Sequence, residues 1–265
     1  ISKLNYNLNF KLMKKLSNKS VFKRRITEFI LFSFFNELKV KKDNIKFHLS
    51  KNNYQLRRIL REDWETVMLN LYHLSSDETL FIDVGANIGI VSCLLSKRVK
   101  FGFAFEPVPS SFSKLVKNIN LNSITNIIPF QMAASDSNDM KTCTNLKNAL
   151  TNYILDEDTE EGRETAQRDG SVKSLSIKLD DLVIPYINKF EDNNILLKID
   201  VEGHEDFVLK GASELLSLDM PIIICLEYES LDRLNSLSKL VQRYNLKKFN
   251  PPNGDDGKNA FFRNS

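Results

Sequence analysis

The stretch from Thr79 to Gly89 constrains the fold of this chain more than any other. It reads Thr-Leu-Phe-Ile-Asp-Val-Gly-Ala-Asn-Ile-Gly, so an apolar, β-rich run ends near Asp83 and then passes through two glycines. The apolar segment that follows, residues 90–95, is expected to be helical. Glycine at such a turn allows a positive φ and a close approach of the backbone to a ligand. The first turn of the helix offers that ligand unpaired N–H groups. The stretch therefore predicts a ligand-binding turn.

A second predicted strand ends in an acid about twenty residues later. Residues 101–105, Phe-Gly-Phe-Ala-Phe, form this short apolar run, and Glu106 follows it. An acid at this distance from a glycine turn is placed to accept hydrogen bonds from the two hydroxyls of a ribose. The glycine turn and the acid together indicate a cofactor that contains a nucleoside.

The spacing of the glycines separates the classes of cofactor. Dinucleotide sites use G-x-G-x-x-G, whose middle glycine makes room for a pyrophosphate, but here Asn87 stands where that glycine is most needed. No Gly-Lys-Ser/Thr follows, so the P-loop is absent as well. The turn from Asp83 to Gly89 instead resembles motif I of S-adenosylmethionine (SAM)-dependent methyltransferases. The alternative is a turn that only connects a strand to a helix, and Glu106 at the expected distance argues against it.

Strand-like and helix-like segments alternate along the chain. Before the glycine turn, residues 45–60 look extended in short pieces and 61–71 have helical spacing. After residue 105 the pattern predicts strands at 127–132, 175–179, 194–199, 221–226 and 259–263. The predicted helices are one capped by Ser110 or Ser111, one from Asp180 to about Phe190, one ending near Gly211 and one at 231–244. This alternation predicts an α/β fold, with a parallel sheet and helices on both faces.

Four of the predicted strands end in an acid. These acids are Asp83, Glu106, Asp200 and Glu227. Ligands of parallel sheets bind beyond the carboxyl ends of the strands. We therefore expect the four carboxylates to lie on one edge of the sheet and to form one site.

Positive charge is concentrated at the beginning of the chain. The net charge is only +3, yet residues 1–61 carry 16 Lys and Arg against three acids. Such a segment is typical of contact with a polyanion or a membrane surface, although a solvated helical face is the simpler interpretation. The apolar run 26–35 is too short to span a bilayer and lacks the cleavage site of a signal peptide. We expect residues 1–45 to be a basic, helix-prone extension, which contacts the body, a partner or a membrane surface, and residues 46–265 to form the main domain.

Two further features bound the organisation of the chain. Residues 137–172 are polar and acidic with little periodicity, and a long insertion of this kind is usually functional or disordered. We expect it to shape the acceptor pocket.

The three cysteines, Cys93, Cys143 and Cys225, are scattered and odd in number, which argues against a disulfide framework and favours a reducing compartment, the cytoplasm.

Several blocks of the sequence follow one another in a characteristic order. They are Asp83–Gly89, Phe105-Glu-Pro107, Ala133-Ala-Ser-Asp136, Leu179-Asp-Asp-Leu182, and Leu197-Lys-Ile-Asp-Val-Glu-Gly-His-Glu205 with Gly211-Ala212. Over residues 60–265 their order and spacing resemble the FkbM family of SAM-dependent methyltransferases, with 137–172 matching poorly and 1–45 lying outside. The resemblance implies a class I methyltransferase fold, Rossmann-like with a mostly parallel seven-stranded sheet. It also implies O-methylation, often of sugar or polyketide hydroxyls.

The resemblance assigns the first group of residues to SAM. The methionine end would be held by Asp83 and by the loop residues Gly85, Ala86, Asn87 and Gly89. The ribose hydroxyls would bind Glu106. The adenine edge would meet Ser135 and Asp136.

The second group would activate the acceptor. An alcohol is a poor nucleophile at neutral pH, so a general base or a metal ion is expected. Asp200, Glu202 and His204 follow the fourth strand, where the acceptor should sit. We expect Glu202 or His204 to be the base and Asp200 an orienting group, although Glu202 could also be an exposed acid at a helix start. No dedicated metal-binding spacing occurs, so no metal is predicted, although an Asp/Glu/His cluster could ligate a divalent cation. His48 and His73 are expected to be structural.

Two other functions stay open at this point. One is an RNA or DNA methyltransferase that holds phosphates with its basic N-terminal segment, and the other is a non-catalytic binding module with a SAM fold. The sequence Asn250-Pro-Pro-Asn253 is similar to the N-P-P-aromatic motif of amino-methyltransferases, but it comes too late, lacks the aromatic residue and predicts a turn. We therefore expect a small-molecule or glycan acceptor and no nucleic acid, with peripheral membrane contact through residues 1–45 as an alternative.

Overall fold

The computed structural model describes most of the chain. The described residues are 8–9, 37–42, 45–50, 62–144, 152–155, 159–187 and 194–264. The apolar run 26–35, expected to be helical, lies outside them. Of the helices within the described ranges, none combines the length and the apolar character needed to cross a membrane.

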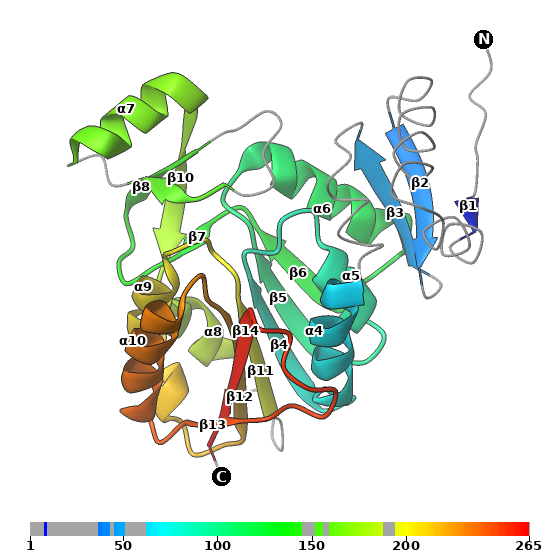
Figure 1. Ribbon diagram of the computed structural model, residues 1–265. Helices are drawn as coiled ribbons and strands as arrows, with labels where there is room; N and C mark the ends of the chain where they lie inside the picture. Colours follow the sequence, from blue (N-terminus) through cyan, green and yellow to red (C-terminus); the bar gives the residue numbers. More distant parts are fainter. Residues whose placement is uncertain are drawn as a thin grey trace.

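Seven strands form the central sheet (Figure 1). In spatial order they are β13 (Lys247–Phe249), β14 (Asn259–Arg263), β12 (Ile222–Glu227), β11 (Asn194–Ile199), β4 (Thr79–Val84), β5 (Phe101–Phe105) and β6 (Ile127–Phe130). Strands β12, β11, β4, β5 and β6 run parallel, and β14 is antiparallel to both of its neighbours. The predicted mostly parallel sheet is confirmed. Only β13, a short and largely exposed strand, has no counterpart in the sequence prediction.

Helices cover both faces of this sheet, as predicted (Figure 1). One face carries α4 (Glu62–His73), α5 (Ile90–Leu95) and α6 (Pro109–Leu121), and the other carries α8 (Leu179–Ile187), α9 (Glu205–Lys210), η1 (Leu215–Ser217) and α10 (Leu231–Gln242). Each face has its own apolar core. Within β4, Phe81 belongs to the first core and Leu80 and Ile82 belong to the second, because successive side chains of a strand point to opposite faces.

The N-terminus of α6 differs from the prediction. The helix begins at Pro109, with Val108 as N-cap and no capping side chain, so Ser110 and Ser111 lie inside it. Proline is favoured at the first helical position because its φ is preset and the N–H that it lacks would be unsatisfied there in any case. In contrast, the predicted turn at Asn253 is confirmed, and Asn70 accepts its backbone N–H at 2.8 Å.

The insertion 137–172 is largely ordered, although its sequence shows little periodicity. Its strands join a second sheet of order β7-β10-β8-β9, built from β7 (Ala133–Ala134), β10 (Ser171–Ile177), β8 (Met140–Thr144) and β9 (Ile154–Leu155). The helix α7 (Glu160–Asp169) follows β9 and is capped by Thr159, whose hydroxyl accepts the N–H of Gly162 at 3.0 Å. A small sheet with mixed pairing needs no long apolar run, which is why the sequence pattern did not reveal it.

A third sheet lies at the N-terminal end and contacts α6 (Figure 1). Its strands are β1 (Leu8–Asn9), β2 (Glu37–Lys42) and β3 (Ile45–Ser50). Strand β2 falls inside the extension 1–45, where helix was expected, and its pairing with β3 explains the difference.

Side-chain amides at α6 tie the hairpin of β2 and β3 to the body, and Asn122 accepts the N–H of Lys46 and donates to its carbonyl, each at 2.7 Å. The Asn118 side chain on α6 accepts the backbone N–H of His48 at 2.7 Å and donates to the carbonyl of Ile88 at 2.8 Å. Ile88 belongs to the glycine turn after β4, so Asn118 connects this turn to the N-terminal sheet. As expected, His48 is one of the buried polar residues of the packed structure, beside the amine of Lys117.

Candidate active site

A cavity lies where β4, β5 and β11 end. The predicted site residues among its lining are Gly85, Asn87 and Glu106 from the loops after β4 and β5, and Asp200, Glu202 and His204 from the segment after β11. The other lining residues are Val84, Phe105, Pro107, Ser111, Met132, Ala133, Ala134, Cys143, Asn152, Tyr153, Ile154 and Val201. The structure thus brings six of the eleven predicted site residues to one cavity.

Gly85 allows the strands beside the cavity to approach closely. Its φ is +78°, and a Cβ built on it would lie 1.9 Å from the carbonyl oxygen of Asp200. The N–H groups of Gly85 and Ala86 both donate to the carbonyl of Phe105, at 3.1 and 2.9 Å. Only glycine fits this position, where the end of β4 meets the chain leaving β11.

Gly89 has a related role on the other side of the turn. Its φ is +79°, and a Cβ there would lie 2.3 Å from Cδ1 of Leu115 on α6. Neither Gly89 nor Ala86 lines the cavity. Both shape the turn and hold it against its neighbours, and their contact with a cofactor stays a prediction.

Glu106 is the most buried acid that lines the cavity, with 6% of its surface exposed. Its carboxylate accepts the backbone N–H of Asn87 at 2.9 Å and that of Val108 at 3.0 Å. Burial raises the pKa of Glu106 to about 7, against the lowering effect of these two hydrogen bonds. A carboxylate offers about four acceptor sites, so about two stay available for a ligand.

Asp83 lies beneath the cavity and does not line it. The side chain is fully buried, and it accepts hydrogen bonds from Ser92 Oγ at 2.5 Å and Lys198 Nζ at 3.1 Å. The same ammonium group lies 3.4 Å from Asp200 Oδ2. Asp83 thus fixes Lys198, and Lys198 joins the ends of β4 and β11, while the contact of Asp83 with a cofactor stays a prediction.

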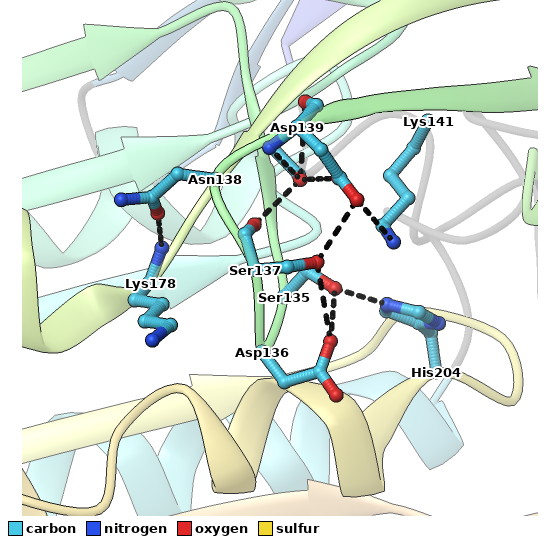
Figure 2. A network of polar contacts seen from close by, with 9 residues as sticks. Ser135, Asp136, Ser137, Asn138, Asp139, Lys141, Lys178 and His204 are labelled. Atoms are coloured by element: carbon cyan, nitrogen blue, oxygen red, sulfur yellow. Dashed lines mark hydrogen bonds and ion pairs between the residues drawn. The ribbon is translucent and has the colours of Figure 1, made fainter.

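The Ser135 hydroxyl points to His204, the Asp136 carboxylate lies beside the hydroxyls of Ser135 and Ser137, and neither residue lines the cavity (Figure 2). Ser135 is fully buried, and its hydroxyl lies 3.0 Å from His204 Nε2 and 3.3 Å from Asp136 Oδ1. The preceding residues, Met132 to Ala134, line the cavity in their place. The contact of Ser135 and Asp136 with the adenine edge stays a prediction.

His204 lies at the start of α9 with its ring packed against an aromatic neighbour. The ring stacks on Phe207 with centroids 4.5 Å apart. Burial lowers the pKa of His204 to about 4, a shift opposed by Asp206 and Asp136 and reinforced by Lys141 and Arg233. At neutral pH the imidazole is therefore uncharged, and burial makes it a weaker base than an exposed histidine.

Glu202 and Gly203 form a strained turn between β11 and α9. Their φ values are +54° and +98°, in the left-handed region. A non-glycine residue in this region is uncommon and often marks a functional site. The turn brings Glu202 to the cavity wall, next to His204.

Three carboxylates gather at the ends of β11 and β12. One oxygen of each of Asp200, Glu202 and Glu227 lies within 4.8 Å of the others. Oxygen atoms at this separation could share a divalent cation. The ammonium of Lys198 already pairs with Asp200, and a cluster of acids alone does not identify a metal centre.

The wall opposite the strand ends comes from the insertion. Cys143 on β8 and Asn152, Tyr153 and Ile154 around β9 all line the cavity. The β8–β9 pairing fixes them, with the Thr144 N–H donating to the Tyr153 carbonyl at 2.9 Å. The sequence predicted the participation of this region but not the residues, because no motif marks them.

Comparison with known proteins places these features in a family. A family model described as the methyltransferase FkbM domain matches residues 83–242. The chain is 31% identical over 163 residues to the hexuronic acid methyltransferase AglP of Haloferax volcanii, a match that covers 60% of each chain. It is 30% identical over 155 residues to the methyltransferase sdnD of Sordaria araneosa, covering 50% of this chain and 60% of the other. The chain thus spans about 60% of the length of each relative.

A similarity to solved structures is also present. The structure of M. jannaschii TYW2 in complex with AdoMet has a TM-score of 0.46 and 14% sequence identity to this chain, over 86% of this chain and 84% of that one.

Proposed function

The chain belongs to the family of the methyltransferase FkbM domain, and from this premise we propose that it is a SAM-dependent O-methyltransferase. Its acceptor would be a hydroxyl group of a sugar, a glycan or another small hydroxylated molecule. The observation that carries the proposal is the single cavity in which Glu106 and the glycine turn face Asp200, Glu202 and His204. The residues proposed to bind the cofactor and the residues proposed to act as the base thus line the same cavity, as a group-transfer reaction requires.

The residues after β4 and β5 fit the chemistry of SAM. The Glu106 carboxylate is buried, keeps acceptor capacity and would bind the two ribose hydroxyls. Gly85 and Asn87 would border the methionine end, and Met132, Ala133 and Ala134 would form an apolar wall for the adenine. When bound, SAM supplies an electrophilic methyl group on a sulfonium, and the protein has to position the acceptor and exclude water.

The segment after β11 would receive the acceptor and its proton. The Ser135 hydroxyl carries one proton, and when this proton is donated to Asp136, the Ser135 oxygen accepts from His204 Nε2–H. That tautomer leaves Nδ1 of His204 as the basic nitrogen. Glu202 is the alternative base, and Asp200, held by Lys198, would orient the acceptor hydroxyl.

The class of acceptor is inferred from two directions. The relative AglP is a hexuronic acid methyltransferase, which favours a sugar. The cavity adds an aromatic side chain, Tyr153, and an amide, Asn152, to the carboxylates of Asp200 and Glu202. Aromatic faces and hydrogen-bonding side chains of this kind suit a ring that carries several hydroxyls.

All three cysteines of the chain are buried free thiols. This arrangement is compatible with a reducing compartment. We therefore propose the cytoplasm as the place of the reaction.

The decisive experiment is titration of SAM and S-adenosylhomocysteine into the purified protein by calorimetry. We expect the wild type to bind both and Glu106→Ala to lose at least about tenfold in affinity, equivalent to 1.4 kcal/mol. Glu78→Ala, at an exposed position before β4, is the matched control and should bind as the wild type does. Absence of binding by folded wild type would contradict the proposal and favour a non-catalytic binding module.

The acceptor is sought in a second experiment with SAM labelled in its methyl group. Neutral and acidic sugars, glycans extracted from cells and total RNA are incubated separately with the protein. We expect alkali-stable label in a carbohydrate fraction, because methyl ethers resist base whereas methyl esters do not. Label in RNA would overturn the acceptor class.

A further inference from the structure

We infer that Arg233 is a positioning residue, whose guanidinium holds the turn that directs Glu202 and His204 into the cavity. Arg233 lies in the first turn of α10, outside every sequence block that identified the site. It does not line the cavity. The inference rests on the proposed function of that cavity. It adds that Arg233 fixes the position of the residues on the acceptor side of the cavity.

The contacts of Arg233 close a ring around Gly203. The Gly203 N–H donates to Glu205 Oε1 at 3.0 Å. Arg233 Nη2 donates to the Gly203 carbonyl at 2.7 Å and to Glu205 Oε2 at 3.1 Å. Both backbone polar groups of Gly203 are therefore held by a single ion pair between Glu205 and Arg233.

The position of Gly203 gives this ring its importance. Gly203 lies between Glu202 and His204, the two candidate bases, and both residues line the cavity. Glu202 and Gly203 have positive φ values of 54° and 98°. A left-handed non-glycine residue is strained and persists only where its surroundings fix it. The Glu205–Arg233 pair supplies that restraint.

The ion pair between Glu205 and Arg233 is partly buried and is reinforced by a second acid. Glu205 is buried, with 3% of its surface exposed, and its carboxylate has Arg233 as a charged partner. Arg233 also pairs with Asp206 at 2.7 Å, and these contacts raise the pKa of the guanidinium above its usual value. Helices α9 and α10 are packed side by side (Figure 1), so the ring connects the segment after β11 with the segment after β12.

The test compares Arg233→Lys and Arg233→Gln with Arg243→Gln, an exposed arginine at the end of the same helix. Lysine keeps the charge that Glu205 needs but is shorter by about one bond of 1.3 Å. We expect Arg233→Lys to fold and to bind SAM within about twofold of the wild type. We expect the Gly203 amide to exchange with deuterium at least about tenfold faster, because its partner Glu205 is no longer fixed.

A spectroscopic signature of His204 provides the readout that a merely structural role would not change. The chain has three histidines, so the ring Cε1–H signal of His204 can be identified with a His204→Gln variant. We expect this signal to move in Arg233→Lys and to stay in place in Arg243→Gln. Arg233→Gln also removes a charge close to His204, so the lysine variant is the decisive one.

Turnover completes the test once an acceptor is known. A loss of about tenfold or more in kcat, with SAM affinity unchanged, would support the inference. An unmoved His204 signal together with wild-type exchange at Gly203 in Arg233→Lys would overturn it, whatever the stability of Arg233→Gln. The exchange and spectroscopic readouts need no acceptor. They therefore decide the role of Arg233 even if the proposed methyl transfer is not found.

Discussion

The Ser135 hydroxyl lies 3.0 Å from Nε2 of His204, and the two residues come from segments that are 69 positions apart in the sequence. Ser135 is fully buried, whereas His204 is partly exposed and lines the cavity, so this contact connects the protein interior with the cavity wall. It connects the segment after β6, expected to meet adenine, with the segment after β11, expected to meet the acceptor. The contact therefore assigns Ser135 to the orientation of the candidate base.

Ser135→Ala should lower kcat by about tenfold and leave SAM affinity unchanged, because His204 loses its orienting partner. His204→Gln should lose about a hundredfold or more if His204 is the general base. Single-turnover rates and calorimetric SAM affinities, measured for both variants, check this. Weaker SAM binding with normal turnover in Ser135→Ala would instead return Ser135 to the adenine site.

SAM affinity should depend on pH through Glu106. Burial raises the pKa of this carboxyl to about 7, and only the ionised form can accept hydrogen bonds from both ribose hydroxyls. Below this pKa, a proton must be released before SAM binds, so affinity should fall by about tenfold between pH 8 and pH 6. Calorimetry at the two pH values measures this, and Glu106→Gln, which cannot ionise, should show weak binding that is nearly independent of pH.

Lys198→Met should destabilise the fold by about 3–5 kcal/mol, because it leaves the carboxylate of Asp83 buried without a charged partner. Urea unfolding monitored by circular dichroism gives the free energy of unfolding. Lys210→Met is the matched control, since its ion pair with Asp206 is largely exposed and should contribute about 0–1 kcal/mol. Equal effects of the two substitutions would contradict the role given to Lys198.

Gly85→Ala and Gly254→Ala should separate backbone strain from steric conflict. Both glycines have positive φ, +78° and +85°, but only Gly85 has a neighbour in the way of a Cβ. Gly254→Ala should cost about 1–2 kcal/mol, the price of the left-handed conformation. Gly85→Ala should cost on the order of 4 kcal/mol or more, because the Asp200 carbonyl has to move. Thermal unfolding and SAM titration of both variants measure the difference.

Tyr153→Ala should change the use of the acceptor and not the binding of SAM. Tyr153 lines the cavity from β9, on the wall that the insertion provides. We expect the KM for a sugar acceptor to rise by about tenfold, as for the loss of a large contact surface, while the SAM dissociation constant stays within about twofold. Tyr186→Ala is the control, because this side chain on α8 packs against Phe103 and does not line the cavity. A loss of SAM affinity in Tyr153→Ala would place this wall in the cofactor site.

The layout of the central sheet was predictable because its strands are continuous apolar runs punctuated by acids and glycines. Gly85, Glu106 and Asp200 could be placed at the edge of the sheet for the same reason, since parallel strands bring their carboxyl ends together. The sequence does not reveal which acid is exposed there. Asp83 and Asp200 both end strands, yet Asp83 is sealed beneath the cavity by Lys198, a partner 115 positions away.

The other discrepancies have the same origin. Tyr153 reaches the cavity through the pairing of β8 with β9, and Arg233 reaches Gly203 across the packing of α10 on α9. Neither contact leaves a local pattern, because both depend on tertiary packing between short elements. At the start of α6 the sequence does contain the local signal, but it is Pro109 that marks the first residue of the helix. The serines after it suggested a cap that the structure does not have.

The Asn118 side chain links the N-terminal sheet to the glycine turn after β4. Its amide is bonded at one end to His48 in β3 and at the other to Ile88 in the glycine turn. A partner that displaces β3 would therefore perturb the turn that borders the SAM site. By thermodynamic reciprocity, if that partner changes the affinity for SAM by some factor, SAM changes the affinity for the partner by the same factor. The N-terminal sheet and the proposed cofactor site would then be coupled through Asn118.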